Sequence, residues 1–143
     1  MYTNIDNTDG LKTVAHFFQT YPDIRRPDKE ILQLLEVSLK NNDFLFNGNC
    51  WLQKSGTAMG KVFAPSYANL FMAKIEEDFF TAIGFRPLLY AKFLDDIFFI
   101  WTDTRKALDT FIHKLGSFHK SIKLTHTISQ EHIDFLDITV FIM

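Results

Sequence analysis

Two adjacent carboxylates inside an otherwise apolar segment place the strongest constraint on how this chain folds. Asp95 and Asp96 follow Phe93-Leu94 and precede the apolar residues 97–101. Burying an unpaired charge in such a segment costs several kcal/mol. Neighbouring residues of a regular strand point to opposite faces of a sheet, so both carboxylates can project together only at a tight turn between two strands. The sequence therefore predicts a β-hairpin with the two aspartates at its tip.

Two interpretations account for this pair of carboxylates, a cation-binding site and a solvated turn. Carboxylates that are held together repel each other unless a divalent cation neutralises them, and hard oxygen ligands suit Mg²⁺ or Mn²⁺. Asp is also a common turn residue, so a solvated turn between two core strands explains the same pattern. The spacing of Asp95 and Asp96 alone supports both readings equally.

The periodicity of apolar residues predicts helices alternating with hairpins. Hydrophobic residues at helical spacing alternate with short runs at strand spacing, and the dipeptide Asn47-Gly48 marks a hairpin turn. Helices are expected at about 9–20 (capped by Asn7 and Thr8), 27–40, 65–83 and 104–118, and strands at 44–46, 50–52, 87–93, 97–101, 122–129 and 133–142. This order predicts an α+β fold with an antiparallel sheet and helices packed on one face.

Composition limits the class of protein. The 143 residues suffice for one domain, and 47% hydrophobic residues with 6 Gly and 4 Pro favour a globular chain. The one cysteine, Cys50, excludes an internal disulfide, and no apolar stretch is long enough to cross a membrane, so we expect a soluble intracellular protein without a membrane partner. The net charge of −2 gives no general attraction to nucleic acid, although residues 105–126 contain five Lys or Arg and a single acid.

A second motif joins a hairpin to a helix. Residues 53–60 read Gln-Lys-Ser-Gly-Thr-Ala-Met-Gly, and Ala64-Pro65 opens the helix that follows. Small residues let a backbone approach a flat ligand closely, and a helix N-terminus favours a phosphate nearby. Taken alone, this pattern is weak, because glycines in a connection are more often turn residues.

Together and in this order, these segments resemble the palm motifs of reverse transcriptases, most closely those of Penelope-like retroelements. The resemblance covers nearly the whole chain. Its motifs are Tyr2–Ile5, residues 53–60 with 64–72, residues 94–101, residues 121–125 and residues 135–138. Phe93-Leu94 stands where the family more often has a Tyr and another aliphatic residue.

The resemblance implies RNA-directed DNA polymerisation, in which two metal ions assist nucleotidyl transfer to a primer 3′ hydroxyl. The implied partners are an RNA template, a DNA primer and a deoxynucleotide, the cofactor is Mg²⁺ or Mn²⁺, and a nuclear location is compatible with this role. The resemblance assigns catalysis and metal binding to Asp95 and Asp96, nucleotide or template binding to Tyr2, Gln53, Gly56, Met59, Gly60 and Lys123, and the primer grip to Phe135, Leu136 and Asp137. Tyr2 is alternatively explained as a tyrosine at the edge of the core, and Lys123 as a solvated lysine on a strand. Ordinary packing explains the apolar pair Phe135 and Leu136 equally well.

One departure from the family pattern is important. The family's first motif supplies another metal-binding Asp a few residues before the aromatic position that Tyr2 occupies, which places it upstream of Met1. Residues 1–143 are therefore expected to form a partial, incomplete palm, without fingers, thumb or this first Asp, and to be inactive alone. The alternative is a non-catalytic retroelement remnant that at most binds nucleic acid or a protein.

Overall fold

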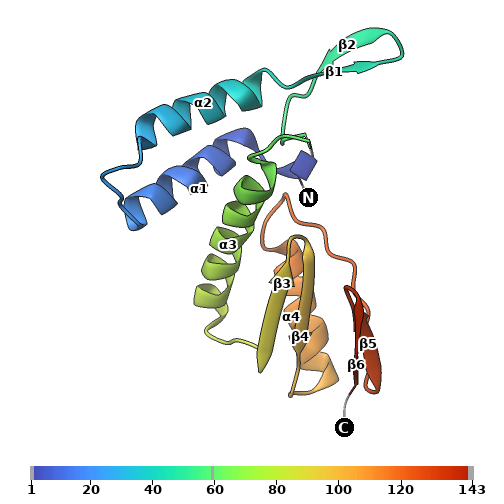
Figure 1. Ribbon diagram of the computed structural model, residues 1–143. Helices are drawn as coiled ribbons and strands as arrows, with labels where there is room; N and C mark the ends of the chain where they lie inside the picture. The colour runs from blue at the N-terminus through green and yellow to red at the C-terminus, as the bar shows by residue number, and fades with distance from the viewer. Residues whose placement is uncertain (1, 59, 142–143) are drawn as a thin grey trace. The chain divides into compact units, whose positions relative to one another are not determined.

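The computed structural model describes residues 2–58 and 60–141, and the chain divides into two compact units, Met1–Phe85 and Arg86–Met143. The elements of the first unit are a 3₁₀ helix (Tyr2–Asn4), α1 (Asn7–Thr20), α2 (Asp28–Lys40), β1 (Asp43–Phe46), β2 (Asn49–Leu52) and α3 (Ala64–Ile83). The second unit contains β3 (Leu89–Phe93), β4 (Asp96–Ile100), α4 (Arg105–Ser117), β5 (His132–Phe135) and β6 (Ile138–Phe141) (Figure 1). The fold is of the α+β class, as the sequence predicts.

Helix α1 begins two residues earlier than its periodicity predicts, because Asp6 is the cap. The Asp6 carboxylate accepts hydrogen bonds from the backbone N–H groups of Thr8 (2.9 Å) and Asp9 (3.1 Å). These bonds satisfy two of the donors that a helix N-terminus leaves open. The prediction that Asn7 and Thr8 cap this helix is therefore wrong, and the side chain of Asn7 is free to bond elsewhere.

Helix α1 meets helix α3 at Gly10. A Cβ atom at this position would lie 1.7 Å from the hydroxyl oxygen of Tyr67, so the Tyr67 side chain occupies the space that any other residue would fill. Tyr67 is buried together with most of the apolar face of α3. The buried residues of α3 are Ala64, Tyr67, Ala68, Phe71, Met72, Ile75, Phe79 and Phe80. Gly84 ends the helix with a φ of +65°, the left-handed conformation that glycine adopts without strain.

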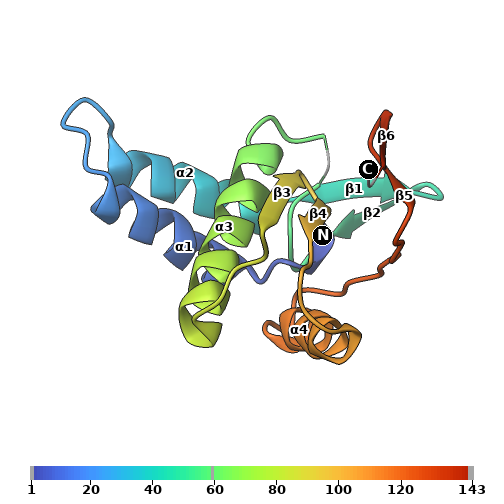
Figure 2. The same cartoon turned by 90° about the horizontal axis from the view of Figure 1, so that it is seen from below.

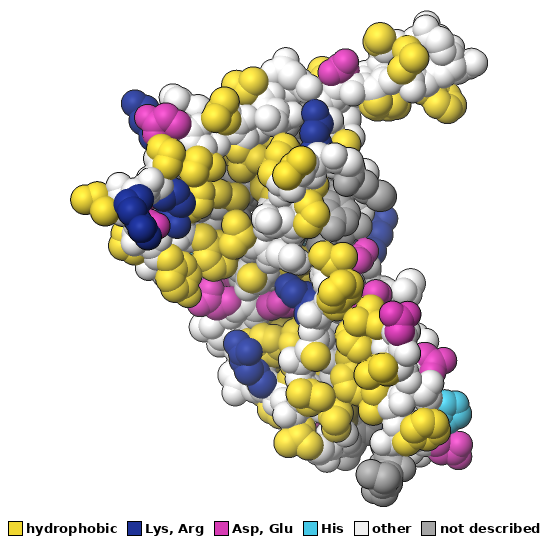
Figure 3. Space-filling model, viewed as in Figure 1, with side chains coloured by type: hydrophobic (Ala, Val, Ile, Leu, Met, Phe, Trp, Pro, Cys, Tyr) yellow, Lys and Arg dark blue, Asp and Glu magenta, His cyan; other side chains and the backbone are white. Residues whose placement is uncertain are grey.

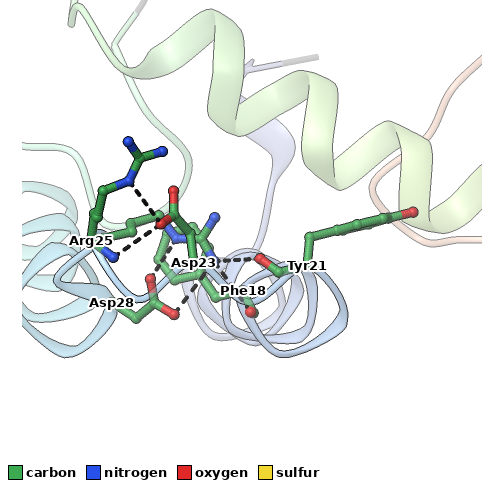
Figure 4. A network of polar contacts seen from close by, with 6 residues as sticks. Phe18, Tyr21, Asp23, Arg25 and Asp28 are labelled. Carbon is green, nitrogen blue, oxygen red and sulfur yellow. Dashed lines mark hydrogen bonds and ion pairs between the residues drawn. The ribbon is translucent and has the colours of Figure 1, made fainter.

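The connection between α1 and α2 is organised by Arg26. Its guanidinium donates hydrogen bonds to the backbone oxygens of Phe18 (3.2 Å) and Tyr21 (2.8 Å) and forms an ion pair with Asp28, and Figure 4 labels these three partners. The guanidinium also lies 4.2 Å from the centre of the Phe18 ring. The hydrogen bond to Asp28 raises the pKa of Arg26 above its ordinary value. These contacts tie the end of α1 to the start of α2, and the two helices run side by side (Figures 1 and 2).

The first hairpin, β1 with β2, is exposed along both strands. Asn47 (φ +49°) and Gly48 (φ +75°) form its two-residue turn, and both have the positive φ of a type I′ turn. Every residue of both strands is exposed, so hydrophobic side chains gather on the surface of this hairpin, at the upper right of Figure 3. The large hydrophobic side chains are Phe44, Leu45, Phe46, Trp51 and Leu52.

The second unit is built on aromatic packing around α4. The ring of Phe111 lies 5.4 Å from that of Phe99 and 5.0 Å from that of Trp101, measured between ring centres. Leu108 and Leu115 are buried on the same helix, and the side chain of Thr104 caps it by accepting a hydrogen bond from the backbone of Ala107. These contacts hold α4 against β4 and the residue that follows it.

The strands differ from the sequence expectation in two ways. Residues 122–129, which alternate as a strand would, have no regular secondary structure, and residues 132–141 form the hairpin of β5 and β6 rather than one strand. In the described residues the strands form three separate two-stranded antiparallel sheets rather than one larger sheet. Alternation alone does not make a strand, because its backbone groups also require a neighbour to pair with.

None of the helices in residues 2–58 and 60–141 is long and apolar enough to cross a membrane.

The contact at Gly10 predicts an unusually costly alanine substitution. Gly10→Ala should lower the free energy of unfolding by about 1–3 kcal/mol, because the new methyl group overlaps Tyr67. Gly116→Ala is the matched control, since a Cβ there meets Leu124 at an ordinary 3.8 Å and a helical Gly→Ala change gains up to about 1 kcal/mol. Urea unfolding of both variants measures the difference. Equal effects would show that α1 and α3 do not meet as described.

The Tyr67 hydroxyl predicts a stability change in alkali. It is buried without a hydrogen-bond partner among the described residues, and burial, with the charges of Asp6 and Asp9, raises its pKa from 10.0 to about 12. A phenol whose pKa is higher in the folded chain stabilises the fold below pH 10 and loses that contribution as the pH rises toward 12. This loss should reach about 2–3 kcal/mol. Tyr67→Phe should remove it, whereas Tyr21→Phe, at an exposed position, should not. Identical pH profiles for the two variants in denaturant titrations would contradict the assignment.

Candidate functional site

The two aspartates lie at the tip of the β3–β4 hairpin, as the sequence predicts. Phe93 pairs with Asp96, so Leu94 and Asp95 are the two turn residues and Asp96 is the first residue of β4. Both aspartates are exposed. The tight turn thus brings two consecutive carboxylates to one end of the hairpin, where they avoid the desolvation cost that a regular strand would impose on one of them.

The turn beside the carboxylates has a strained backbone. Leu94 has a φ of +53°, a conformation that costs a residue with a Cβ atom roughly 1–2 kcal/mol. Asp95 does not share the positive φ, which is the pattern of a type II′ turn, where glycine is the favoured first residue. The β5–β6 hairpin repeats the arrangement, with Leu136 at φ +55° followed by Asp137. Two Phe-Leu-Asp tips in one unit therefore carry the same strain.

The donor set at the β3–β4 tip fits a hard divalent cation that keeps part of its water. Within the described ranges, no side chain forms a hydrogen bond or ion pair with Asp95 or Asp96. No group of three His, Cys, Asp or Glu side chains that could enclose a metal ion occurs there either. Mg²⁺ is commonly bound through one or two carboxylates, with waters and substrate phosphates completing its shell. Two exposed carboxylates that have no side-chain partner in the described part of the chain meet that requirement.

The base of the carboxylate hairpin is fixed by aromatic contacts. The Phe99 ring of β4 packs against Tyr90 of β3 (6.4 Å between ring centres) and against Phe111 of α4 (5.4 Å). On the same strand, the Phe98 ring lies 5.4 Å from that of Phe135, at the end of β5. The structure therefore brings the predicted primer-grip residue Phe135 into contact with the strand that begins with Asp96.

The connection between β2 and α3 is held by side-chain amides. Gly56 is buried with a φ of +72°, and its backbone N–H donates to the side-chain oxygen of Asn7 at 3.0 Å. The side chain of Gln53 accepts a hydrogen bond from buried Asn42 (3.0 Å) and donates one to the backbone oxygen of Ser55 (2.9 Å). The oxygen and the NH2 group of the Gln53 side-chain amide are thus both engaged in hydrogen bonds within the protein.

The remaining predicted residues occupy different settings. Gly60 and Lys123 are exposed, and Lys123 lies in the irregular segment 122–129 instead of on a strand. Leu136 is 50% exposed at the β5–β6 tip, and Asp137 is exposed beside it. Tyr2 lies in the short 3₁₀ helix, whereas Met59 is outside the described residues. Tyr2, Gln53, Gly56 and Gly60 belong to the first unit, and the aspartates, Lys123 and the primer-grip residues to the second.

Sequence reasoning missed Asn7 as a neighbour of the glycine-containing connection. Asn7 and Gly56 are 49 residues apart in the chain, and an Asn before a helix normally indicates a cap. The signal that could have separated the two roles is Asp6, an equally good cap one residue earlier. With Asp6 at the cap, the Asn7 side chain is available for a long-range bond.

Comparison with protein-family models, curated proteins and solved structures finds no match to this chain.

The strained hairpin tips predict a stabilising glycine substitution. Leu136→Gly should raise the free energy of unfolding by up to about 1 kcal/mol, because glycine adopts a positive φ without strain and the half-exposed Leu136 side chain loses little burial. Ile138→Gly, two residues later and 61% exposed on β6, should lower it, because glycine is disfavoured in a strand. Thermal unfolding compares the two variants. Destabilisation of equal size in both would show that the tip is not strained.

Proposed function

We propose that this chain is part of a reverse transcriptase palm, in which the β3–β4 tip takes part in metal-assisted nucleotidyl transfer once the rest of the enzyme is present. The observation that supports this most strongly is the tip itself. Asp95 and Asp96 are exposed, without a side-chain partner in the described residues, and next to a strained Leu94. Strained backbone is retained where surrounding structure enforces it, and such sites cluster where ligands are held.

The chain's own residues would contribute position and charge. Asp95, in the turn, is the better candidate for direct metal contact, and Asp96, the first residue of β4, is the companion carboxylate. When bound, the metal ions would stabilise the attacking and leaving oxygens of the phosphoryl transfer. Aromatic packing of β4 on α4 would keep the carboxylates in place, which matters because small displacements weaken catalysis strongly.

The resemblance assigns binding roles to the other predicted residues. Gly60, which is exposed, would lie under the incoming nucleotide and template base, where the lack of a side chain allows close approach, and buried Gly56 would shape the floor beneath them. Lys123 would neutralise the leaving pyrophosphate, and Phe135 to Asp137 would contact the primer. Gln53 has both side-chain functions engaged internally, so its proposed contribution is through the shape of the connection rather than through a direct contact.

Charge distribution is compatible with a polyanionic substrate. Residues 105–126 contain Arg105, Lys106, Lys114, Lys120 and Lys123 against Asp109, and all of these lie in the second unit with the aspartates. Arg105 pairs with Asp109 at 3.0 Å, whereas Lys106, Lys114 and Lys123 are exposed. A local excess of basic side chains attracts phosphates even when the net charge of the chain is −2.

A metal titration tests the proposal. Calorimetry with Mn²⁺ should detect binding to the wild type, and Asp95→Asn or Asp96→Asn should weaken it at least about tenfold, because each variant removes one of two anionic ligands. Glu131→Gln is the matched control, an exposed acid in the same unit that should leave the affinity unchanged. Equal affinities for the wild type and all three variants would contradict the metal site.

A primer-extension assay provides the second measurement. A polypeptide that contains residues 1–143 and extends a DNA primer on an RNA template should lose that activity on Asp95→Asn and keep it in Glu131→Gln, the exposed acid used as the control above. Undiminished extension by the Asp95→Asn variant would contradict the catalytic role of Asp95.

A binding module without catalysis is the second candidate. The exposed hydrophobic side chains of β1 and β2 favour it, because such a surface is typical of sites of protein interaction. The two candidates differ in the metal titration: a pure binding module would bind Mn²⁺ no better than its Asp95→Asn variant.

A further inference from the structure

The described residues of the connection from Gln53 to Phe63 form no helix or strand. Two residues in its first half are nevertheless buried. Gly56 is buried, and Thr57 is 1% exposed. Buried backbone groups must find hydrogen-bond partners, since leaving one unpaired costs about 1–3 kcal/mol. The hydrogen-bond partners of these backbone groups therefore determine how rigidly the connection is held.

Hydrogen bonds hold the connection at two points, Gln53 and Gly56. At its start, the backbone N–H of Gln53 donates to the backbone oxygen of Asn42 (2.8 Å), and the Gln53 side chain bridges Asn42 and Ser55. Further along, Asn7 accepts the hydrogen bond from Gly56, which links the connection to the first turn of α1. We call Asn7, Asn42 and Gln53 the amide clamp.

The same turn of α1 also locates the helix that follows the connection. Gly10, three residues after Asn7, meets Tyr67 on α3. One turn of α1 therefore contacts the chain on both sides of residues 57–63, at Gly56 and at Tyr67. A displacement of Asn7 would move Gly56 relative to the start of α3.

We infer that Asn7 is a positioning residue, which holds Gly56 in the conformation that the ligand-binding connection requires. The inference rests on the proposed function, in which Gly56 lies beneath the nucleotide. A site that binds a flat base needs its floor fixed before the ligand arrives, because ordering it on binding weakens affinity. The hydrogen bond that Asn7 accepts from Gly56 supplies that order.

Hydrogen exchange tests the clamp directly. In Asn7→Ala, the Gly56 amide should exchange at least about fivefold faster, which corresponds to the loss of one hydrogen bond of about 1 kcal/mol. Asn7→Asp keeps an acceptor oxygen and should keep the protection. Asn69→Ala, an exposed Asn of α3, is the matched control and should change nothing at Gly56. Equal exchange in the wild type and Asn7→Ala, or no rescue by Asn7→Asp, would overturn the inference.

A binding assay tests whether the clamp affects function. It measures the binding of a fluorescent RNA template–DNA primer in the presence of Mn²⁺ and a deoxynucleotide. Asn7→Ala should weaken this binding severalfold, and Asn7→Asp should restore it. Val14→Ala, a core change on the same helix, should lower stability without weakening binding. If Val14→Ala weakens binding as much as Asn7→Ala does, the role of Asn7 is merely structural and the inference fails. If the wild type does not bind while the exchange results hold, the proposed function fails and the clamp stands.

Discussion

The first turn of α1 contacts both helix α3 and the connection that leads into it. Gly10 lets α3 come close to α1, because Tyr67 of α3 fills the volume next to it. The side chain of Asn7 accepts a hydrogen bond from Gly56, in the connection that leads into α3. Both contacts require that α1 starts at Asn7, and this start is set by the Asp6 cap. A single carboxylate at the cap thus determines which side chains of the turn face the rest of the unit.

In the second unit, aromatic packing opposes backbone strain. The turn at Leu94 has an unfavourable φ, and a two-stranded hairpin is marginally stable by itself. The rings of Phe99, Trp101 and Phe111 supply the contacts that hold β4 in place. Because these contacts lie at the base of the hairpin, its tip can carry two carboxylates and a strained residue without support of its own. This division of roles suits a site whose ligands must be exposed.

The sequence predicts local features of the fold better than its long-range contacts. The β3–β4 turn follows from the cost of burying Asp95 or Asp96, and the ends of α3 follow from Pro65 and Gly84, because each of these depends on neighbouring residues. The expected strand at 122–129 is absent, since a strand also needs a pairing partner that periodicity does not reveal. Local patterns do not reveal the positive φ of Leu94 either, because leucine ordinarily avoids that conformation. They also miss the hydrogen bond from Gly56 to Asn7, because 49 residues separate the two partners.

The exposed hairpin of β1 and β2 has a consequence for the behaviour of the protein in concentrated solution. From Phe44 to Gln53 the chain carries no charge, and both outer edges of this two-stranded sheet lack a paired strand in the described residues. Natural sheets commonly protect such edges with lysine, proline or a covering element, and this hairpin has none of them within its strands. Edges that are unpaired in the described part of the chain can template pairing with another copy, and such pairing would increase with protein concentration. A lysine introduced at Leu45 or Leu52 would place a charge where edge-to-edge pairing must begin.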